Sequence, residues 1–215
     1  MFTGGALLLI LGVTLFSVVM TPSTALVYSC RMKPGLDRET ITLALRRLSE
    51  LLRERGVQGE ICLFGGTAMV LAFNARERTK DVDAVFHPPQ LVRELATVVQ
   101  DELSLPAEWL NDAVKGFLAA DLRPVMYDLP QFENLRVTAP PAEYLLAMKC
   151  MAARIASGTD SGGDVDDIRF LIRHLGLDSA EQALAIVAGY YPQSRVPPRT
   201  QYLLEEIFEE SGRQS

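Results

Sequence analysis

The apolar positions after residue 36 begin with a helical pattern. Leucine and isoleucine side chains recur there three or four residues apart and would share one face of a helix: Ile41, Leu45, Leu48 and Leu52. Asp37 stands where an N-cap residue belongs, and Gly56 is placed to end the helix. The sequence therefore predicts a first amphipathic helix that starts after Asp37 and stops near Gly56.

Short apolar runs and helical patterns alternate over the next hundred residues. The predicted strands are residues 60–64, 81–86, 124–129 and 134–139. The predicted helices among them are residues 67–74, 90–103 and 107–119. Beyond Pro140-Pro141 only helical patterns follow, at residues 141–156, 164–175, 179–190 and 199–210. These patterns predict an α/β (α+β) fold, with a small mixed sheet in a core over residues 36–140 and a helical region over residues 141–215.

The first thirty residues carry no charged side chain, and residues 6–20 are almost continuously apolar. Three interpretations of this leader, residues 1–31, stay open: a membrane anchor through residues 5–28, a secretory signal, or an over-extended reading frame with translation starting at Met32. The apolar run is short for a membrane span, and no positive charge precedes it as in a secretory signal. We favour the late start, which predicts a cytoplasmic protein, and keep the membrane-anchored protein as the alternative.

Charge and composition exclude several classes of function. The net charge of −6 and the pI near 5.0 argue against broad binding to nucleic acid, although a local basic groove for one RNA end remains compatible. Three widely spaced cysteines make a disulfide framework or a zinc knuckle improbable. Only two histidines are present, which argues against a histidine-rich metal site.

A glycine turn follows the first predicted strand and opens a helix. Gly65 and Gly66 allow the backbone to approach a ligand closely, and a helix start offers free N–H groups to a phosphate. Thr67 would add a hydroxyl or cap the helix. Taken alone, the motif is better explained as an ordinary strand-to-helix turn, because it is neither a G-x-G-x-x-G sequence nor a P-loop.

Two aspartates at the second predicted strand suggest a metal site. Side chains alternate along a strand, so Asp81 and Asp83 are expected to point the same way. Mg²⁺ typically takes one or two carboxylates together with substrate phosphates, which matches this pair. The alternative is a solvent-facing strand edge, with Asp81 paired to Lys80 or Arg78.

Further charged residues lie in the predicted helical region. Lys149 stands among apolar residues and could reach toward phosphates, although a lysine extending to solvent is the more probable interpretation of its spacing. Asp164 could N-cap the next helix, and Asp167 would share its face. Asn111, near Trp109, could line a cleft opposite the metal, or it could belong to the solvated face of a helix.

Four sequence blocks together resemble one class of proteins: GGTA at 65–68, ERTKDVDAVF at 77–86, EYLLAMK at 143–149 and DVDDIRFLI at 164–172. In order and approximate spacing they resemble nucleotidyltransferase-fold families of bacterial toxin–antitoxin and phage-defence systems. The nearest is an uncharacterised bacterial family related to the AbiEii-type toxin nucleotidyltransferases. The resemblance spans about residues 36–210 and implies a polymerase-beta-like core.

The resemblance also implies roles for individual residues. The phosphate turn would be Gly65, Gly66 and Thr67, and the metal ligands would be Asp81 and Asp83. Lys149 would contact a phosphate, and Asp164 or Asp167 would be an auxiliary acid. The family's third metal carboxylate has only weak candidates here, Asp128 and Glu133, and the second glycine stands where many such enzymes have serine.

The activity expected from this resemblance is transfer of a nucleoside monophosphate from an NTP. Mg²⁺ or Mn²⁺ would serve as cofactor, and Arg78 and Lys149 would stabilise the developing charge. The acceptor stays open: RNA such as tRNA, a protein, or a small molecule. A cognate antitoxin or other partner protein is a further expectation, as is a membrane contact if the leader is an anchor. The alternative function is a catalytically silent module that binds a nucleotide or a partner.

Overall fold

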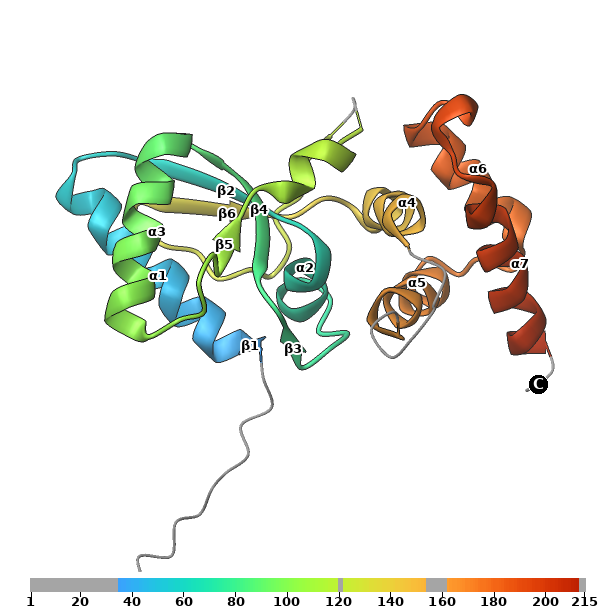
Figure 1. The fold of residues 1–215 in the computed structure, drawn as a ribbon, viewed down its shortest axis with the longest axis horizontal. Helices are drawn as coiled ribbons and strands as arrows, with labels where there is room; N and C mark the ends of the chain where they lie inside the picture. The colour runs from blue at the N-terminus through green and yellow to red at the C-terminus, as the bar shows by residue number, and fades with distance from the viewer. Residues whose placement is uncertain (1–34, 120–121, 154–161, 213–215) are drawn as a thin grey trace, which may run out of the picture. The chain divides into compact units, whose positions relative to one another are not determined.

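Seven α-helices and a small mixed β-sheet make up the described part of the chain, residues 35–119, 122–153 and 162–212 of a computed structural model (Figure 1). The strands are β1 (Leu36–Asp37), β2 (Gly59–Leu63), β3 (Arg78–Thr79), β4 (Val82–His87), β5 (Leu110–Asn111) and β6 (Leu135–Thr138). The helices are α1 (Arg38–Glu54), α2 (Gly65–Leu71), α3 (Pro89–Leu103), α4 (Ala142–Ala152), α5 (Gly162–His174), α6 (Ala180–Tyr190) and α7 (Pro198–Gly212). Two short 3₁₀ helices are η1 (Ala113–Phe117) and η2 (Gln193–Arg195). This mixed α/β composition confirms the predicted fold class at that level.

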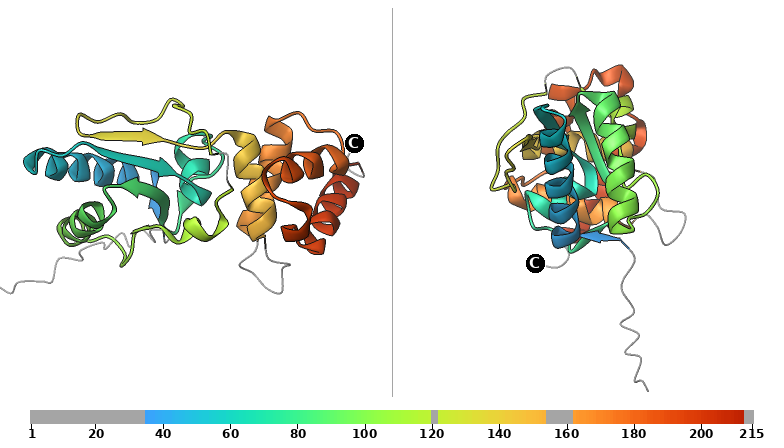
Figure 2. Two further views of the ribbon diagram at one scale, coloured as in Figure 1. Left: turned by 90° about the horizontal axis from the view of Figure 1, so that it is seen from above. Right: turned by 90° about the vertical axis from the view of Figure 1, so that its left-hand side faces the viewer.

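The main sheet has the strand order β5-β4-β2-β6. β2 pairs antiparallel with β4 and parallel with β6, and β4 pairs parallel with the short β5. α1 and α3 pack against each other, with α1 next to β6 and α3 next to β4 (Figures 1 and 2). Alternate residues of β4 are fully buried (Val82, Ala84 and Phe86), whereas Asp83 and Val85 are half-buried. The strand therefore presents Asp83 on the side away from its apolar face.

α1 begins and buries its apolar face as the sequence pattern predicts. The Asp37 carboxylate accepts a hydrogen bond from the Thr40 backbone N–H at 2.9 Å, which caps the helix. The four predicted core positions, Ile41, Leu45, Leu48 and Leu52, are completely buried. The packing of α1 is thus set by the spacing of its apolar residues.

The predicted helix over residues 107–119 is wrong. The structure has β5 and η1 in this segment instead, because local features interrupt a helix. Glu108 has a positive φ of 56°, and the Asn111 side chain accepts a hydrogen bond from the Ala113 N–H at 3.1 Å, as in a turn. Trp109 is buried, and its indole N–H donates to the Ala96 carbonyl at 3.0 Å.

The predicted strand over residues 124–129 is also wrong. It reduces to one isolated bridge between Val125 and Ala139. The Gln131 side-chain amide donates to the Val137 carbonyl at 3.3 Å, so side-chain contacts occupy part of the β6 edge in place of a strand. The predicted strand over 134–139 corresponds to β6.

From Ala142 onward, every regular element that the structure describes is helical. α4 packs against α5 and α6, and α6 packs against α7. Almost every residue of α4 is buried, including the charged Lys149. The described residues from Gly35 to Gly212 belong to one compact unit. The interpretations of residues 1–31 concern a segment outside the described residues. Within the described ranges, no helix is both long enough and apolar enough to cross a membrane.

Candidate active site

The turn between β2 and α2 brings its first glycine against an aspartate of β4. Gly65 has φ of +52°, a backbone conformation that residues with a side chain rarely adopt. A Cβ atom at this position would lie 2.6 Å from Oδ2 of Asp83. The backbone of β4 is tied to the same turn, since the Phe64 N–H donates to the Asp83 carbonyl at 2.8 Å. The lack of a side chain at Gly65 therefore lets the Asp83 carboxylate lie directly against the turn.

The next two residues of the turn have different surroundings. A Cβ atom on Gly66 would lie 2.3 Å from the Thr79 hydroxyl and 3.4 Å from a guanidinium nitrogen of Arg76. Thr67 is completely buried, and its hydroxyl donates to the backbone carbonyl of Asp81 at 2.9 Å. The Thr67 side chain thus holds the segment that carries Asp81, and in this structure it does not face a ligand space.

Asp81 and Asp83 come together through a neighbouring strand. β4 begins at Val82, so strand alternation does not by itself align the two aspartates. In the register between β4 and β5, Asp83 lies opposite Asn111. The Asn111 amide donates to Oδ2 of Asp81 at 3.2 Å and also hydrogen-bonds the Asp83 carboxyl group. Asn111 therefore joins the two carboxylates, a role that the sequence spacing did not assign to it.

The surroundings of Asp83 disfavour its negative charge. Burial raises the pKa of this carboxyl group, and the nearby Asp81 raises it further. The Asn111 hydrogen bond and the positive charge of Lys149 act in the opposite direction. A divalent cation beside the two carboxylates would relieve the same electrostatic conflict.

The available donor set fits a hard cation that completes its shell elsewhere. Asn111 hydrogen-bonds Asp81, and both residues influence the charge of Asp83; such a pair of neighbouring carboxylates would suit Mg²⁺ or Mn²⁺ with substrate phosphates as further ligands. In the described part of the chain, no group of three or more His, Cys, Asp or Glu side chains is placed to hold a metal. The pair formed by Asp81 and Asp83 has two carboxylates only, and it stays a prediction for the metal position.

Lys149 is buried rather than directed to solvent. Only 8% of this residue is exposed. Its ammonium group lies 2.7 Å from Oδ1 of Asp164 and 2.7 Å from Oδ2 of Asp167. The prediction that the spacing favoured, a lysine extended to solvent, is wrong. The structure brings Lys149, Asp164 and Asp167 together, and the charge of Lys149 acts on Asp83.

Arg78, one of the predicted nucleotide-binding residues, forms an ion pair at the start of α1. Its guanidinium lies 2.5 Å from the carboxylate of Asp37, the cap of α1. The arginine beside the turn is Arg76, which donates to Oδ2 of Asp167 at 3.0 Å and to the Arg78 carbonyl at 3.0 Å. Arg76 could not be singled out from the sequence, since two arginines so close together give no sign of which one turns toward Gly66.

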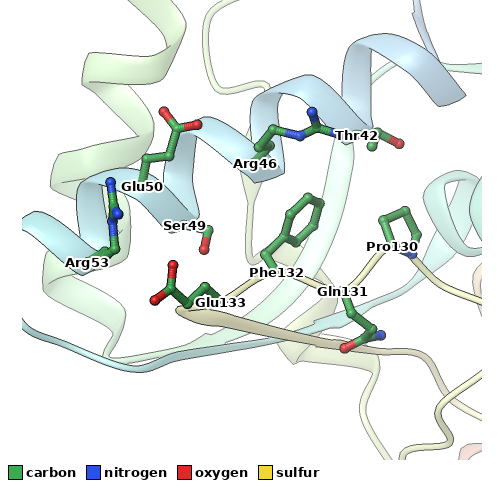
Figure 3. Close-up of a pocket in the computed structure, with 9 residues that line it drawn as sticks. All are labelled: Thr42, Arg46, Ser49, Glu50, Arg53, Pro130, Gln131, Phe132 and Glu133. Carbon is green, nitrogen blue, oxygen red and sulfur yellow. The ribbon is translucent and has the colours of Figure 1, made fainter.

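The two weak candidates for a third carboxylate are found elsewhere. Glu133 lines a cavity of about 550 Å³ between α1 and the segment before β6, with Arg46, Arg53 and Phe132 (Figure 3). Asp128 is exposed on the loop before that segment. The residue opposite Asp83 on the neighbouring strand is Asn111, whose amide cannot serve as a third carboxylate.

Comparisons with known proteins do not extend these observations. No family model matches the chain, and neither a curated protein nor a solved structure matches it. The resemblance to nucleotidyltransferases therefore stays a prediction from the four sequence blocks, and the argument for function rests on the geometry of the site.

Proposed function

We propose that this chain is a metal-dependent nucleotidyltransferase with a polymerase-beta-like core. The observation that carries the proposal is the meeting of Asp81 and Asp83 at Asn111, directly beside the glycine turn. Lys149 lies near enough to act on the Asp83 charge. Paired carboxylates next to a close-approach turn and a buried cation suit the handling of a metal-bound nucleotide.

In this proposal Asp81 and Asp83 hold Mg²⁺ or Mn²⁺, and Asn111 fixes both carboxylates. When bound, the metal supplies charge neutralisation at the reacting phosphate. The contribution of the chain is positioning: Thr67 holds the backbone of Asp81, and Gly65 leaves room for Asp83. A site whose ligands are fixed before substrate arrives loses little free energy to reorganisation.

The proposed reaction transfers a nucleoside monophosphate from an NTP. A bond forms between the acceptor hydroxyl oxygen and the α-phosphorus, and the bond from that phosphorus to the bridging oxygen of the β-phosphate breaks. The electron pair of the broken bond leaves with pyrophosphate, and the hydroxyl proton passes to water. Orientation and electrostatic stabilisation supply most of the acceleration in such phosphoryl chemistry.

The acceptor belongs to one of three chemical classes: an RNA end such as that of tRNA, a protein side chain, or a small molecule with a free hydroxyl. A cognate antitoxin or other partner protein accompanies the proposal, in line with the resemblance stated above. Because the reaction consumes NTP, we place it in the cytoplasm. A membrane partner enters only if residues 1–31 act as an anchor.

A second function has a specific observation in its favour. Asn111 stands beside Asp83 where an acid would complete a three-carboxylate metal site, and an amide cannot take up a proton from an acceptor hydroxyl. The alternative proposal is therefore a catalytically silent module of the same fold that binds a nucleotide or a partner protein.

Calorimetry tests whether the chain has a nucleotide site, which the enzyme and the nucleotide-binding module both require and a partner-binding module does not. Each NTP is titrated into the protein with and without Mg²⁺, alongside the Asp83→Ala variant. Binding that requires the metal and disappears in the variant supports a nucleotide site at the aspartate pair. If no NTP binds with or without Mg²⁺, the proposal of a nucleotidyltransferase is contradicted. Only a module that binds partner proteins then remains.

A further inference from the structure

We propose that Arg76 binds the β- and γ-phosphates of the nucleotide, and that Asp167 positions its guanidinium. This inference rests on the proposed function and deepens it by naming a residue for the terminal phosphates that the sequence resemblance does not name. It also gives Asp167 a role different from the auxiliary acid that the sequence resemblance implies.

Arg76 is held directly at the glycine turn. A Cβ atom on Gly66 would lie 3.4 Å from one of its terminal nitrogens, and a Cβ atom on Gly163 would lie 3.3 Å from the other. The guanidinium therefore lies between the start of α2 and the start of α5, where both neighbours lack side chains. About a third of the Arg76 side chain (32%) is exposed, so its remaining donors can reach a ligand.

Asp167 connects this arginine to the buried lysine. Its side chain is 4% exposed, and its Oδ2 atom lies 3.0 Å from Arg76 and 2.7 Å from Lys149. Two cations held at one carboxylate oxygen would repel each other strongly without the negative charge between them. A carboxylate with both neighbours ion-paired is poorly suited to proton transfer, whereas it is well suited to fixing the position of two cations.

Neighbouring glycines of the turn lie against Asp83 and against Arg76. The carboxylate of Asp83 lies beside Gly65, and the guanidinium of Arg76 lies beside Gly66. Lys149 acts on the charge of Asp83 and contacts Asp167. In this proposal, a nucleotide held at the aspartate pair directs its terminal phosphates to Arg76. Arginine suits this position because its planar fork matches phosphate oxygens.

The test compares nucleotides that differ in their terminal phosphates. Affinities of Mg²⁺-bound NTP, of inorganic pyrophosphate and of the nucleoside monophosphate are measured by calorimetry for wild type, Arg76→Ala, Arg76→Lys and Asp167→Asn. Arg78→Ala is the matched control, because this neighbouring arginine contacts Asp37 instead. Thermal unfolding of every variant checks that it is folded.

We expect Arg76→Ala to weaken NTP and pyrophosphate roughly tenfold or more, the scale of a charge-assisted hydrogen bond, and to leave the monophosphate unchanged. Arg76→Lys should restore only part of the loss, since lysine lacks the fork. Asp167→Asn should weaken NTP as well, without changing the affinity for Mn²⁺ alone. Arg78→Ala should bind like wild type.

Three contrary results have different meanings. Wild type that binds NTP, with Arg76→Ala binding it equally well, overturns this inference and leaves the proposed function standing. Wild type that binds neither NTP nor pyrophosphate overturns the proposed function and this inference with it. Equal losses in Arg76→Ala and Arg78→Ala, together with lowered unfolding temperatures, would show a structural effect and overturn the assignment of Arg76.

Discussion

Replacement of Gly65 by alanine tests whether the glycine turn leaves room for the carboxylate of Asp83, the proposed metal ligand. Alanine would have to adopt the left-handed conformation of Gly65, which costs about 1–2 kcal/mol. Its Cβ atom would also lie 2.6 Å from Oδ2 of Asp83, so the carboxylate or the turn must move. Overpacking of this kind costs typically about 1–3 kcal/mol. The expected loss of unfolding free energy is therefore about 2–5 kcal/mol.

Gly56→Ala is the matched control for the backbone contribution. Gly56 has φ of +64° after the end of α1, and a Cβ atom there would meet nothing within 4 Å. This variant should lose only the conformational contribution, about 1–2 kcal/mol. Since about 1 kcal/mol shifts the unfolding temperature of a chain of this size by roughly 2–4 °C, calorimetry or circular dichroism resolves the two variants.

Metal binding gives a second and independent readout. Mn²⁺ binding, followed by electron paramagnetic resonance, should weaken in Gly65→Ala because Asp83 is displaced, and it should remain at the wild-type level in Gly56→Ala. Equal destabilisation of the two variants, with unchanged Mn²⁺ binding in both, would refute the claim that Gly65 is glycine to accommodate the Asp83 carboxylate.

Two further predictions concern single carboxylates. Because burial and Asp81 raise the pKa of Asp83 in the folded protein, its charge destabilises the metal-free fold as the pH rises through that pKa. Asp83→Asn should therefore raise the unfolding temperature of the metal-free protein at pH 7 and abolish stabilisation by Mg²⁺; a lower unfolding temperature of the metal-free variant would contradict this. Hydrogen bonds from the Thr40 hydroxyl and N–H, followed by the Arg78 contact, lower the pKa of Asp37, so its stabilising effect is present at neutral pH and is lost as the pH falls below about 4. Asp37→Ala should cost about 1 kcal/mol at pH 7 and much less near pH 2 in denaturant titrations, and an equal cost at both pH values would show that the cap does not act through its charge.

Patterns with a strong local cause could be predicted from the sequence. The apolar spacing and the cap of α1 fix its start and its buried face, and the structure has both. The helix predicted over residues 107–119 failed because its decisive features are local turn contacts. The Asn111 side chain accepts a hydrogen bond from the backbone N–H of Ala113, and the Trp109 indole N–H donates to the carbonyl of Ala96 in α3. A periodic pattern of apolar residues reveals neither hydrogen bond.

The sequence predicted which residues belong to the candidate site better than it predicted which of them contact one another. Asp81, Asp83, Lys149, Asp164 and Asp167 were all candidates from the sequence. Which of them meet depends on strand register and on the packing of α4 and α5 beside the core, and these are long-range properties. For the same reason the choice between Arg76 and Arg78 could not be made from spacing, because each contacts a residue far away in the chain.

Nucleotidyl transfer at the aspartate pair can be measured by following a labelled nucleotide. Protein starting at Met32 is incubated with each α-labelled NTP, Mg²⁺ and bacterial RNA and protein, alongside the variant that combines Asp81→Ala with Asp83→Ala. We expect label in an RNA or protein band with wild type and not with the double variant. Label transfer that persists in the double variant would contradict the assignment of the site. No transfer from any NTP to RNA, protein or added small-molecule hydroxyls would contradict the enzyme and favour the silent binding module.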